Sequence, residues 1–216
     1  MKPIPTTLHH CVLMPEAAGA GPHPLLVLLH GRGADEEDLL SLAPVLDERL
    51  LILSVRAPQP FEGGGYTWYD LGGPVGQPEQ VSFAASYKAL MDFLQVAVAG
   101  YPVDPGRVFL FGFSMGAVMS LALSLTRPEL FRGVCAHSGY VPEGVPIRWD
   151  ALAGPEYFLL HGTEDPVIPV VMARRAQRLF AASNARFFYR EYPMQHQISE
   201  ESLSDIREWI HRLLNP

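Results

Sequence analysis

Short apolar runs alternate along the chain with longer stretches in which apolar residues recur every three or four positions. The short runs are rich in Val, Leu, Ile and aromatic residues, which is typical of buried strands. They span residues 25–30, 50–57, 108–113, 131–139, 156–162 and 185–193. The periodic stretches predict helices over residues 35–46, 81–99, 115–126, 167–183 and 199–214. This alternation predicts an α/β fold, in which a mainly parallel central sheet has helices on both faces.

The length of the chain, 216 residues, fits a single domain that spans residues 1–216. Asp35 and Ser199 stand where two of the helices are expected to begin, and both are good N-cap residues. A long loop rich in Gly and Pro, residues 58–80, follows the second strand. Because ligands bind beyond the carboxyl ends of the strands in parallel sheets, we expect the functional residues in the loops that follow the strands.

The amino-acid composition narrows the kinds of molecule that the protein is expected to bind. The formal net charge is -7, and the chain contains only two lysines. It therefore lacks the concentrated basic face that a nucleic-acid partner requires. No apolar run approaches the roughly 20 residues of a membrane-spanning helix. The N-terminal stretch, interrupted by Pro3 and Pro5, has no continuous apolar segment of the kind found in signal peptides. We expect a cytoplasmic protein without membrane insertion.

The two cysteines, Cys11 and Cys135, both lie in apolar, strand-like segments. That context favours small buried hydrophobic residues over a disulfide or a pair of metal ligands. No H-E-x-x-H motif or Cys/His spacing points to a metal site, so none is expected.

A small hydroxyl residue stands at the end of one apolar run. Ser114 lies between Gly112 and Gly116, where a predicted strand gives way to a helix, in a G-x-S-x-G pattern. A sharp strand-to-helix turn crowds the positions two before and two after the serine, so that only small residues fit. The turn lifts the hydroxyl out of the sheet and leaves the next backbone amide free at a helix N-terminus. In this context the pattern favours a nucleophile over a structural tight turn.

A serine nucleophile needs a base, and the base needs an orienting acid. Asp165 and His196 each stand in the loop after a predicted strand, and the chain order Ser114, Asp165, His196 is the order of α/β-hydrolases. Taken alone, Asp165 can be a turn residue before Pro166 and His196 a polar loop residue; together they favour the roles of acid and base.

Other residues compete for these two roles. Glu164 is an alternative acid, and we interpret His161 as a structural or supporting residue. The remaining candidates for the base lack a partnered context; they are His137, His9 and His10.

A tetrahedral intermediate also needs donors for its oxyanion. The sequence His30-Gly31-Arg32-Gly33 ends the first central strand, where a backbone amide can face Ser114. The amides of Arg32 and Met115 are the expected donors, although a plain Gly-rich loop is the simpler interpretation of this segment. It is not a phosphate-binding loop, because neither G-K-[ST] nor G-x-G-x-x-G follows.

Five segments together carry a family resemblance: HGRGADEEDLL, YTWYD, GFSMGA, HGTEDPVIPV and YPMQHQIS. They resemble the phospholipase/carboxylesterase family of small serine α/β-hydrolases, which includes acyl-protein thioesterases and many bacterial carboxylesterases. The resemblance runs from about residue 25 to the C-terminus. It implies an α/β-hydrolase fold without a large cap domain, no cofactor, and hydrolysis of carboxylic esters or thioesters. On this likeness Ser114 is the nucleophile, Asp165 the acid and His196 the base, and Arg32 and Met115 occupy the two oxyanion-hole positions.

The sequence departs from the family pattern at several positions. Met115 and Ala117 stand where Gln and Gly are usual, and Gln195 replaces the common Gly before the histidine. Since the oxyanion hole uses a backbone amide, Met115 is expected to preserve catalysis, while its side chain alters the pocket. Arg32 replaces the Leu of the thioesterase branch, which favours a bacterial esterase-like subgroup.

The long loop after the second strand contains four aromatic residues beside three consecutive glycines. These side chains either form one wall of a substrate pocket or pin the loop to the body of the protein; they are Phe61, Tyr66, Trp68 and Tyr69. Trp149 is a further candidate for lining the same cleft. We expect a serine hydrolase of small-molecule esters with short to medium acyl chains. The alternatives are a thioesterase, a lysophospholipase, an acyltransferase or a peptidase with the same triad, or a non-catalytic binding protein on the hydrolase fold. A homodimer is compatible with the resemblance.

Overall fold

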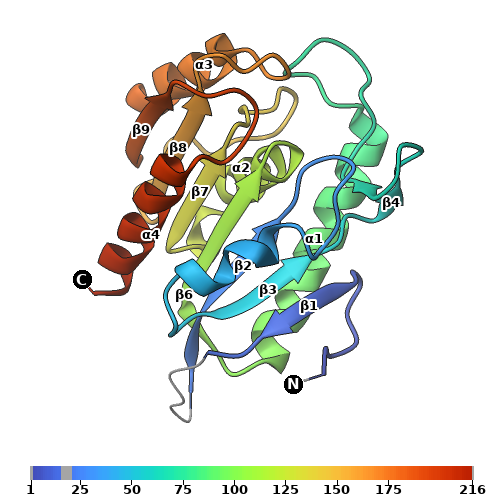
Figure 1. Ribbon diagram of the computed structural model, residues 1–216, viewed down its shortest axis with the longest axis vertical. Helices are drawn as coiled ribbons and strands as arrows, with labels where there is room; N and C mark the ends of the chain where they lie inside the picture. Colours follow the sequence, from blue (N-terminus) through green and yellow to red (C-terminus); the bar gives the residue numbers. More distant parts are fainter. Residues whose placement is uncertain (1, 16–20, 216) are drawn as a thin grey trace.

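The computed structural model describes residues 2–15 and 21–215. Seven strands form one sheet in the order β1-β3-β2-β6-β7-β8-β9, and all neighbours are parallel except β1 and β3 (Figure 1). The strands are β1 (His10–Leu13), β2 (His23–Leu29), β3 (Leu51–Val55), β6 (Val103–Phe113), β7 (Gly133–His137), β8 (Glu156–Gly162) and β9 (Arg186–Tyr192). The mainly parallel sheet agrees with the prediction from the alternating pattern. Residues 1 and 16–20 of the N-terminal stretch considered for a signal peptide lie outside the described residues.

Helices cover both faces of the sheet, and successive residues of a strand enter different cores. Leu25, Val27 and Leu29 belong to one cluster, whereas Leu26 and Leu28 belong to the other. The first core is completed by α1 (Gln80–Gly100), α2 (Met115–Thr126) and α3 (Val170–Ala181), and the second by η1 (Leu39–Val45) and α4 (Glu200–Leu214). Figure 1 shows α4 in front of the sheet and α1 behind it. Burial on both faces explains why these strands read as continuous apolar runs.

The structure corrects the helix expected over residues 35–46. Only Leu39–Val45 is helical, and as a 3-10 helix with Pro44 inside it. Proline has no N–H to continue an α-helical ladder, which favours short, tighter turns there. Asp35 caps no helix: its carboxylate accepts the N–H of Glu37 within a turn. The cap expected at Ser199 is confirmed, because its side chain accepts the N–H of Ser202 in a capping box.

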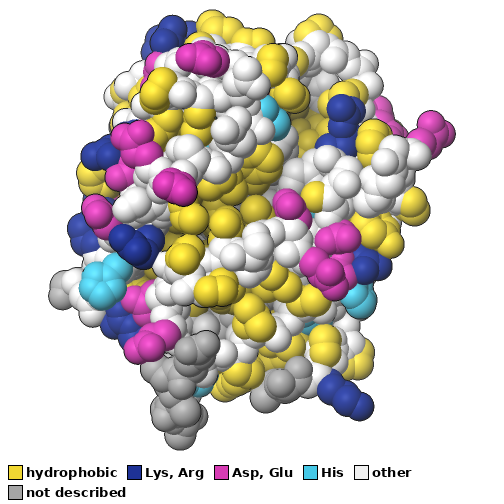
Figure 2. Space-filling model, in the orientation of Figure 1, with side chains coloured by type: hydrophobic (Ala, Val, Ile, Leu, Met, Phe, Trp, Pro, Cys, Tyr) yellow, Lys and Arg dark blue, Asp and Glu magenta, His cyan; other side chains and the backbone are white. Residues whose placement is uncertain are grey.

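The long loop after β3 is more ordered than the sequence suggested. It contains a short antiparallel hairpin of β4 (Gln59–Pro60) and β5 (Tyr66–Thr67). A short 3-10 helix, η2 (Pro128–Leu130), follows α2. On the face of the molecule in Figure 2, charged side chains of both signs gather along the margins and hydrophobic ones fill much of the middle.

Both cysteines are free thiols, Cys135 buried and Cys11 half-buried. Among the described residues, no helix combines the length and apolar character needed to cross a bilayer.

Candidate active site

Ser114 sits on the turn between the end of β6 and the first residue of α2. Its φ of 55° lies in the left-handed region, which costs a non-glycine residue conformational energy and marks strained turns at functional sites. Its backbone N–H donates to the carbonyl of His137 at 2.9 Å, so β7 holds the turn in place. The residue as a whole is buried, at 8 % exposure.

The two glycines around Ser114 are required for different reasons. A Cβ at Gly112 would lie 2.3 Å from the carbonyl oxygen of Gly116, in the first turn of α2. A Cβ at Gly116 would lie 1.9 Å from the carbonyl oxygen of Leu29, at the end of β2. Both distances are far below van der Waals contact. The G-x-S-x-G pattern therefore reflects two separate close approaches of the backbone, one within the turn and one between the start of α2 and the end of β2.

Asp165 lies in the loop after β8, with its side chain completely buried. One carboxylate oxygen, Oδ1, accepts the backbone N–H groups of Val167 and Ile168, each at 2.8 Å. The other oxygen, Oδ2, lies 2.6 Å from Nδ1 of His196. Backbone donors from its own loop thus fix the carboxylate and leave one oxygen for the histidine.

His196 lies in the loop after β9 and connects the other two side chains. Its Nε2 is 2.9 Å from Oγ of Ser114. An imidazole that donates Nδ1–H to Asp165 has a free lone pair on Nε2, which accepts the serine proton. The ring of Phe113 packs 5.0 Å from the imidazole ring, centroid to centroid, and limits its rotation.

The loops that carry Asp165 and His196 are joined by their backbones. The N–H of Thr163 donates to Tyr192 O and that of Glu164 to Met194 O. A Cβ at Gly162 would lie 2.2 Å from the carbonyl oxygen of Met194, so this close approach needs glycine. Sequence reasoning missed Gly162, although a glycine directly after a buried strand is a signal for such an approach.

The other histidines considered for the base, and Glu164 as the other candidate acid, lie apart from the serine hydroxyl or behind it. Nε2 of His161 donates to Ile168 O at 2.8 Å and lies 3.4 Å from Asp165, where burial lowers its pKa. His137 is buried between the hydroxyls of Ser138 and Ser202. The others are distant from the serine or exposed: His10 bonds Tyr101, His9 approaches Glu36, and Glu164 is exposed.

The loop after β2 passes directly beside the serine. A Cβ at Gly31 would lie 3.3 Å from Cβ of Ser114. Nδ1 of His30 bonds the Gly31 carbonyl at 2.6 Å, and its Nε2 accepts the N–H of Ala57 at 3.0 Å. Burial lowers the pKa of His30 and so favours this neutral form. Because C=O and N–H point in opposite directions in a trans peptide, the N–H of Arg32 points away from His30.

Met115 supplies the second expected donor. It is the first residue of α2, and the first N–H groups of a helix have no partner within the helix. The structure thus brings both expected donor positions next to Ser114, and it adds His30 as the residue that orients the Gly31–Arg32 peptide. His30 was visible in the sequence only as the polar residue that ends an apolar run.

Comparison with known proteins shows the family of the chain. The sequence profile described as phospholipase/carboxylesterase matches residues 15–214. The chain belongs to the phospholipase/carboxylesterase family. The resemblance seen in the sequence is therefore confirmed, and the protein is a hydrolase.

Curated relatives of this hydrolase fall into both branches of the family. It is 29 % identical over 164 residues to acyl-protein thioesterase 1 of Debaryomyces hansenii, covering 70 % of each chain. It is 25 % identical over 169 residues to the carboxylesterase SOBER1 of Arabidopsis thaliana, covering 68 % of each chain. A solved carboxylesterase of Bacillus cereus superposes with a TM-score of 0.84 at 26 % identity, covering 95 % of this chain and 94 % of the other. The α/β-hydrolase fold is confirmed, and the described residues contain no large cap domain.

The aromatic residues of the long loop divide into two groups in this hydrolase. Trp68 and Tyr69 are buried, at 0 % and 1 % exposure. The indole N–H of Trp68 donates to His30 O at 2.8 Å, and the hydroxyls of Tyr69 and Tyr140 are 3.1 Å apart. Both side chains pin the loop to the body of the protein, which was one of the two interpretations of these residues. Phe61 and Tyr66, in contrast, are half-buried at the hairpin of β4 and β5.

The expectation for Trp149 is wrong. After β7 the chain crosses back over α2, and Arg148 N–H donates to Leu125 O near the end of that helix. Trp149 there packs edge-on against Phe180, in the last turn of α3. Twelve residues of α2 separate this end of the helix from Ser114.

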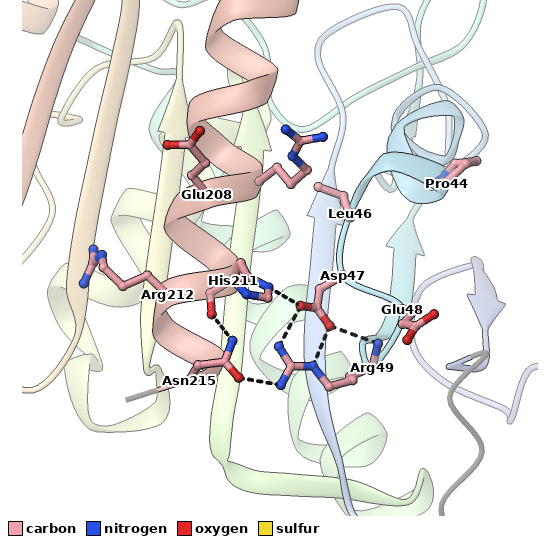
Figure 3. Close-up of a pocket in the computed structure, with 10 residues that line it drawn as sticks. Pro44, Leu46, Asp47, Glu48, Arg49, Glu208, His211, Arg212 and Asn215 are labelled. Atoms are coloured by element: carbon pink, nitrogen blue, oxygen red, sulfur yellow. Dashed lines mark hydrogen bonds and ion pairs between the residues drawn. The ribbon is translucent and has the colours of Figure 1, made fainter.

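A polar groove of about 770 Å³ lies away from the site, between the end of η1 and the last turns of α4 (Figure 3). Asp47 at its centre accepts hydrogen bonds from Arg49 and His211. Hydrogen bonds from the Arg49 guanidinium lower the pKa of Asp47 to about 2. No serine, threonine or cysteine lines the groove, so it offers a carboxylate and a histidine without a nucleophile.

Proposed function

We propose that this hydrolase is a serine carboxylesterase that cleaves esters of short to medium acyl chains, with Ser114 as nucleophile, His196 as base and Asp165 as orienting acid. The observation that carries the proposal is the continuous chain of hydrogen bonds from Ser114 Oγ through His196 to Asp165, with distances of 2.9 and 2.6 Å. A hydroxyl is a weak nucleophile at neutral pH, and an adjacent base that an acid orients is what activates it.

In the proposed reaction, Oγ of Ser114 attacks the ester carbonyl carbon while its proton passes to Nε2 of His196. The resulting oxyanion accepts the N–H groups of Arg32 and Met115. Collapse of the intermediate breaks the bond to the alcohol oxygen, which takes the proton from Nε2 and leaves. Water then attacks the acyl-serine in the same way and releases the acid, restoring the Ser114 hydroxyl.

Exposed aliphatic side chains near the site support an apolar acyl group. Val167, two residues from Asp165, is 53 % exposed, and Val171 at the start of α3 is 57 % exposed. The loop after β5 approaches the same helix, because a Cβ at Gly76 would lie 2.9 Å from Cε of Met172. Its Leu71 and Val75 are exposed as well. Exposed aliphatic side chains on these two segments suit contact with a hydrocarbon chain.

Labelling with a fluorophosphonate, followed by mapping of the modified residue by mass spectrometry, tests the nucleophile. The expected result is one label on Ser114 and none in the S114A variant. A folded protein that takes no label, or takes it elsewhere, would contradict the proposal and favour a non-catalytic binding protein.

A thioesterase is the second candidate, because curated relatives are named acyl-protein thioesterase 1. Lysophospholipase activity is a variant of the same chemistry. Rates for matched 4-nitrophenyl oxyesters and acyl thioesters of increasing chain length separate these candidates. We expect a higher kcat/KM for the oxyesters, with a maximum at short to medium chains; a preference for long-chain thioesters would favour the second candidate.

We further propose that residues 1–216 act as a single domain in the cytoplasm, on small-molecule esters, with no nucleic-acid partner. A homodimer is compatible with this proposal. Light scattering of the purified protein measures its oligomeric state, and cell fractionation its location.

A further inference from the structure

Arg32 follows Gly31, which contacts Ser114, and no countercharge pairs with its side chain among the described residues. It is exposed, and no carboxylate lies within 4 Å of it in the part of the chain that the structure describes. Arg56, the other cation on the loops after β2 and β3, pairs instead with buried Glu36. The loops that carry Ser114, Asp165 and His196 contain no Lys or Arg. Arg32 is thus the one uncompensated cation that these described loops offer to a bound molecule.

The guanidinium of Arg32 rests on a fixed platform. Its Cζ lies 5.2 Å from the centre of the Phe61 ring. Two backbone hydrogen bonds, Gly33 N–H to Tyr66 O and Tyr66 N–H to Ala34 O, tie the Arg32 loop to the hairpin that carries Phe61. A guanidinium stacked on an aromatic ring keeps its N–H edge free, and that edge matches the two oxygens of a carboxylate.

The position of Arg32 determines which groups of a bound substrate its positive charge can reach. Gly31, its neighbour, is in contact with Ser114. Burial raises the pKa of Tyr69 well above its usual range, while Arg32 acts in the opposite direction, so the positive field reaches the inner side of the loop. The net charge of -7 repels anions, but salt screens such repulsion beyond about 8 Å at physiological ionic strength. A local cation is therefore what decides whether an anionic substrate is accepted.

We propose that Arg32 makes this enzyme prefer esters that carry a carboxylate close to the cleaved bond. The inference rests on the proposed function, because it requires hydrolysis at Ser114. It concerns the guanidinium, whereas the oxyanion role belongs to the backbone N–H of the same residue. Substitutions that change the guanidinium affect both kinds of ester through the backbone, so the ratio of rates isolates the side chain.

Two matched substrate pairs test the proposal. Mono(4-nitrophenyl) adipate against 4-nitrophenyl hexanoate varies the charge on the acyl side. The pair 4-acetoxybenzoate and 4-acetoxybenzamide varies it on the leaving-group side. For each pair the ratio of kcat/KM, anionic over neutral, is measured in the wild type and in the R32Q, R32K and R207Q variants. Arg207 is exposed on α4 beside the polar groove, so R207Q removes the same charge far from the site.

We expect R32Q to lower the ratio about three- to tenfold in at least one pair, the range for loss of one charge-assisted hydrogen bond at a partly exposed site. R32K retains part of the preference, and R207Q leaves both ratios unchanged. Added salt lowers the wild-type ratio more than the R32Q ratio.

Unchanged ratios in R32Q for both pairs, or an equal fall in R207Q, would overturn the inference and leave the proposed function intact. The proposed function fails separately if S114A hydrolyses the four esters as fast as the wild type, and the inference then fails with it.

Discussion

Two hydrogen-bonded Asp–His pairs occur among the residues that the structure describes, and they differ in almost every other respect. Asp165 and His196 are 2.6 Å apart, with side chains 0 % and 16 % exposed. Asp47 and His211 are 3.1 Å apart, and the histidine is 68 % exposed. Asp165 accepts two backbone N–H groups and no guanidinium, whereas Asp47 accepts the guanidinium of Arg49 as well as its backbone N–H.

The contrast shows what an Asp–His pair needs before it can do acid–base chemistry. A neighbouring arginine already neutralises Asp47, so little of its negative charge is left to stabilise a protonated histidine. Asp165 has no such cation, and a hydroxyl lies on the far nitrogen of its histidine. The local partners, and not the pair itself, therefore distinguish the candidate active site from the polar groove.

Removing each histidine tests the contrast most directly. We expect His196→Ala to lower kcat/KM for 4-nitrophenyl butyrate by about 10⁴-fold or more, because the base of the proposed triad is lost. His211→Ala is the matched control and changes the rate by less than about twofold, as exposed substitutions away from a site do. Similar losses in both variants would mean that the groove takes part in the reaction.

Backbone packing around the nucleophile gives the next largest effect. Gly116→Ala places a methyl group against Leu29 O, and we expect it to lower the free energy of unfolding by about 3 kcal/mol. Gly154→Ala is the control, since a Cβ there meets nothing within 4 Å. Urea unfolding of both variants measures the difference. A Gly116→Ala protein as stable as the Gly154→Ala protein would show that the turn has room to relax.

The buried histidine behind the site makes stability depend on pH. Burial, aided by His161 and His196, lowers the pKa of His137 to about 3. Below about pH 6.5 the unfolded chain binds a proton that the folded protein does not, so stability falls with pH by about 1.4 kcal/mol per unit for this residue. The contribution is fully present above that pH and is lost progressively as the pH falls toward 3.

We therefore expect His137→Gln to reduce the slope of unfolding free energy against pH in the acid range. The reduction is about 1.4 kcal/mol per pH unit, which corresponds to the uptake of one fewer proton on unfolding. His211→Gln, which alters an exposed histidine that bonds Asp47, should leave the slope unchanged above the range in which Asp47 titrates, about pH 4 to 6.5. Equal slopes in the wild type and His137→Gln would show that His137 takes up its proton in the folded state.

The smallest effect on stability is expected for a substitution in the polar groove. The depressed pKa of Asp47 stabilises the folded state above about pH 3.8, and this contribution disappears as the pH falls through about 2. Because Arg49 is 38 % exposed and water screens the pair, we expect Asp47→Asn to cost only about 1 kcal/mol at neutral pH. Ester hydrolysis should not change. Thermal unfolding at neutral and acid pH provides the measurement, and a loss of activity in folded Asp47→Asn would link the groove to the site.

The sequence allowed the candidate site to be located because its residues stand at the ends of buried strands. Apolar runs mark where β6, β8 and β9 end, and parallel strands bring those ends to one edge of the sheet. Ser114, Asp165 and His196 each follow such a run. Their place at one edge could therefore be predicted from the parallel sheet, and their roles from the chain order that α/β-hydrolases share.

Other features depended on contacts that no local pattern encodes. The orientation of Trp68 is set by the carbonyl of His30, 38 positions earlier in the chain. Trp149 lies far from the site because the segment after β7 returns along α2, and its aromatic character could not reveal that path. The expected helix over 35–46 was wrong because one residue, Pro44, outweighed an otherwise helical pattern.

The backbone link between the loops after β8 and β9 has a consequence for sequence variation. The backbone N–H groups of Thr163 and Glu164 join the two loops, the Thr163 hydroxyl adds a bond to Tyr192 O at 3.2 Å, and the close approach at Gly162 requires glycine. Substitutions at 164 and 195 can therefore alter what an incoming molecule meets while the acid and the base keep their spacing. Gln195 is one such position, and it is exposed. These rim positions are suitable for varying specificity by mutagenesis without disturbing the proposed chemistry.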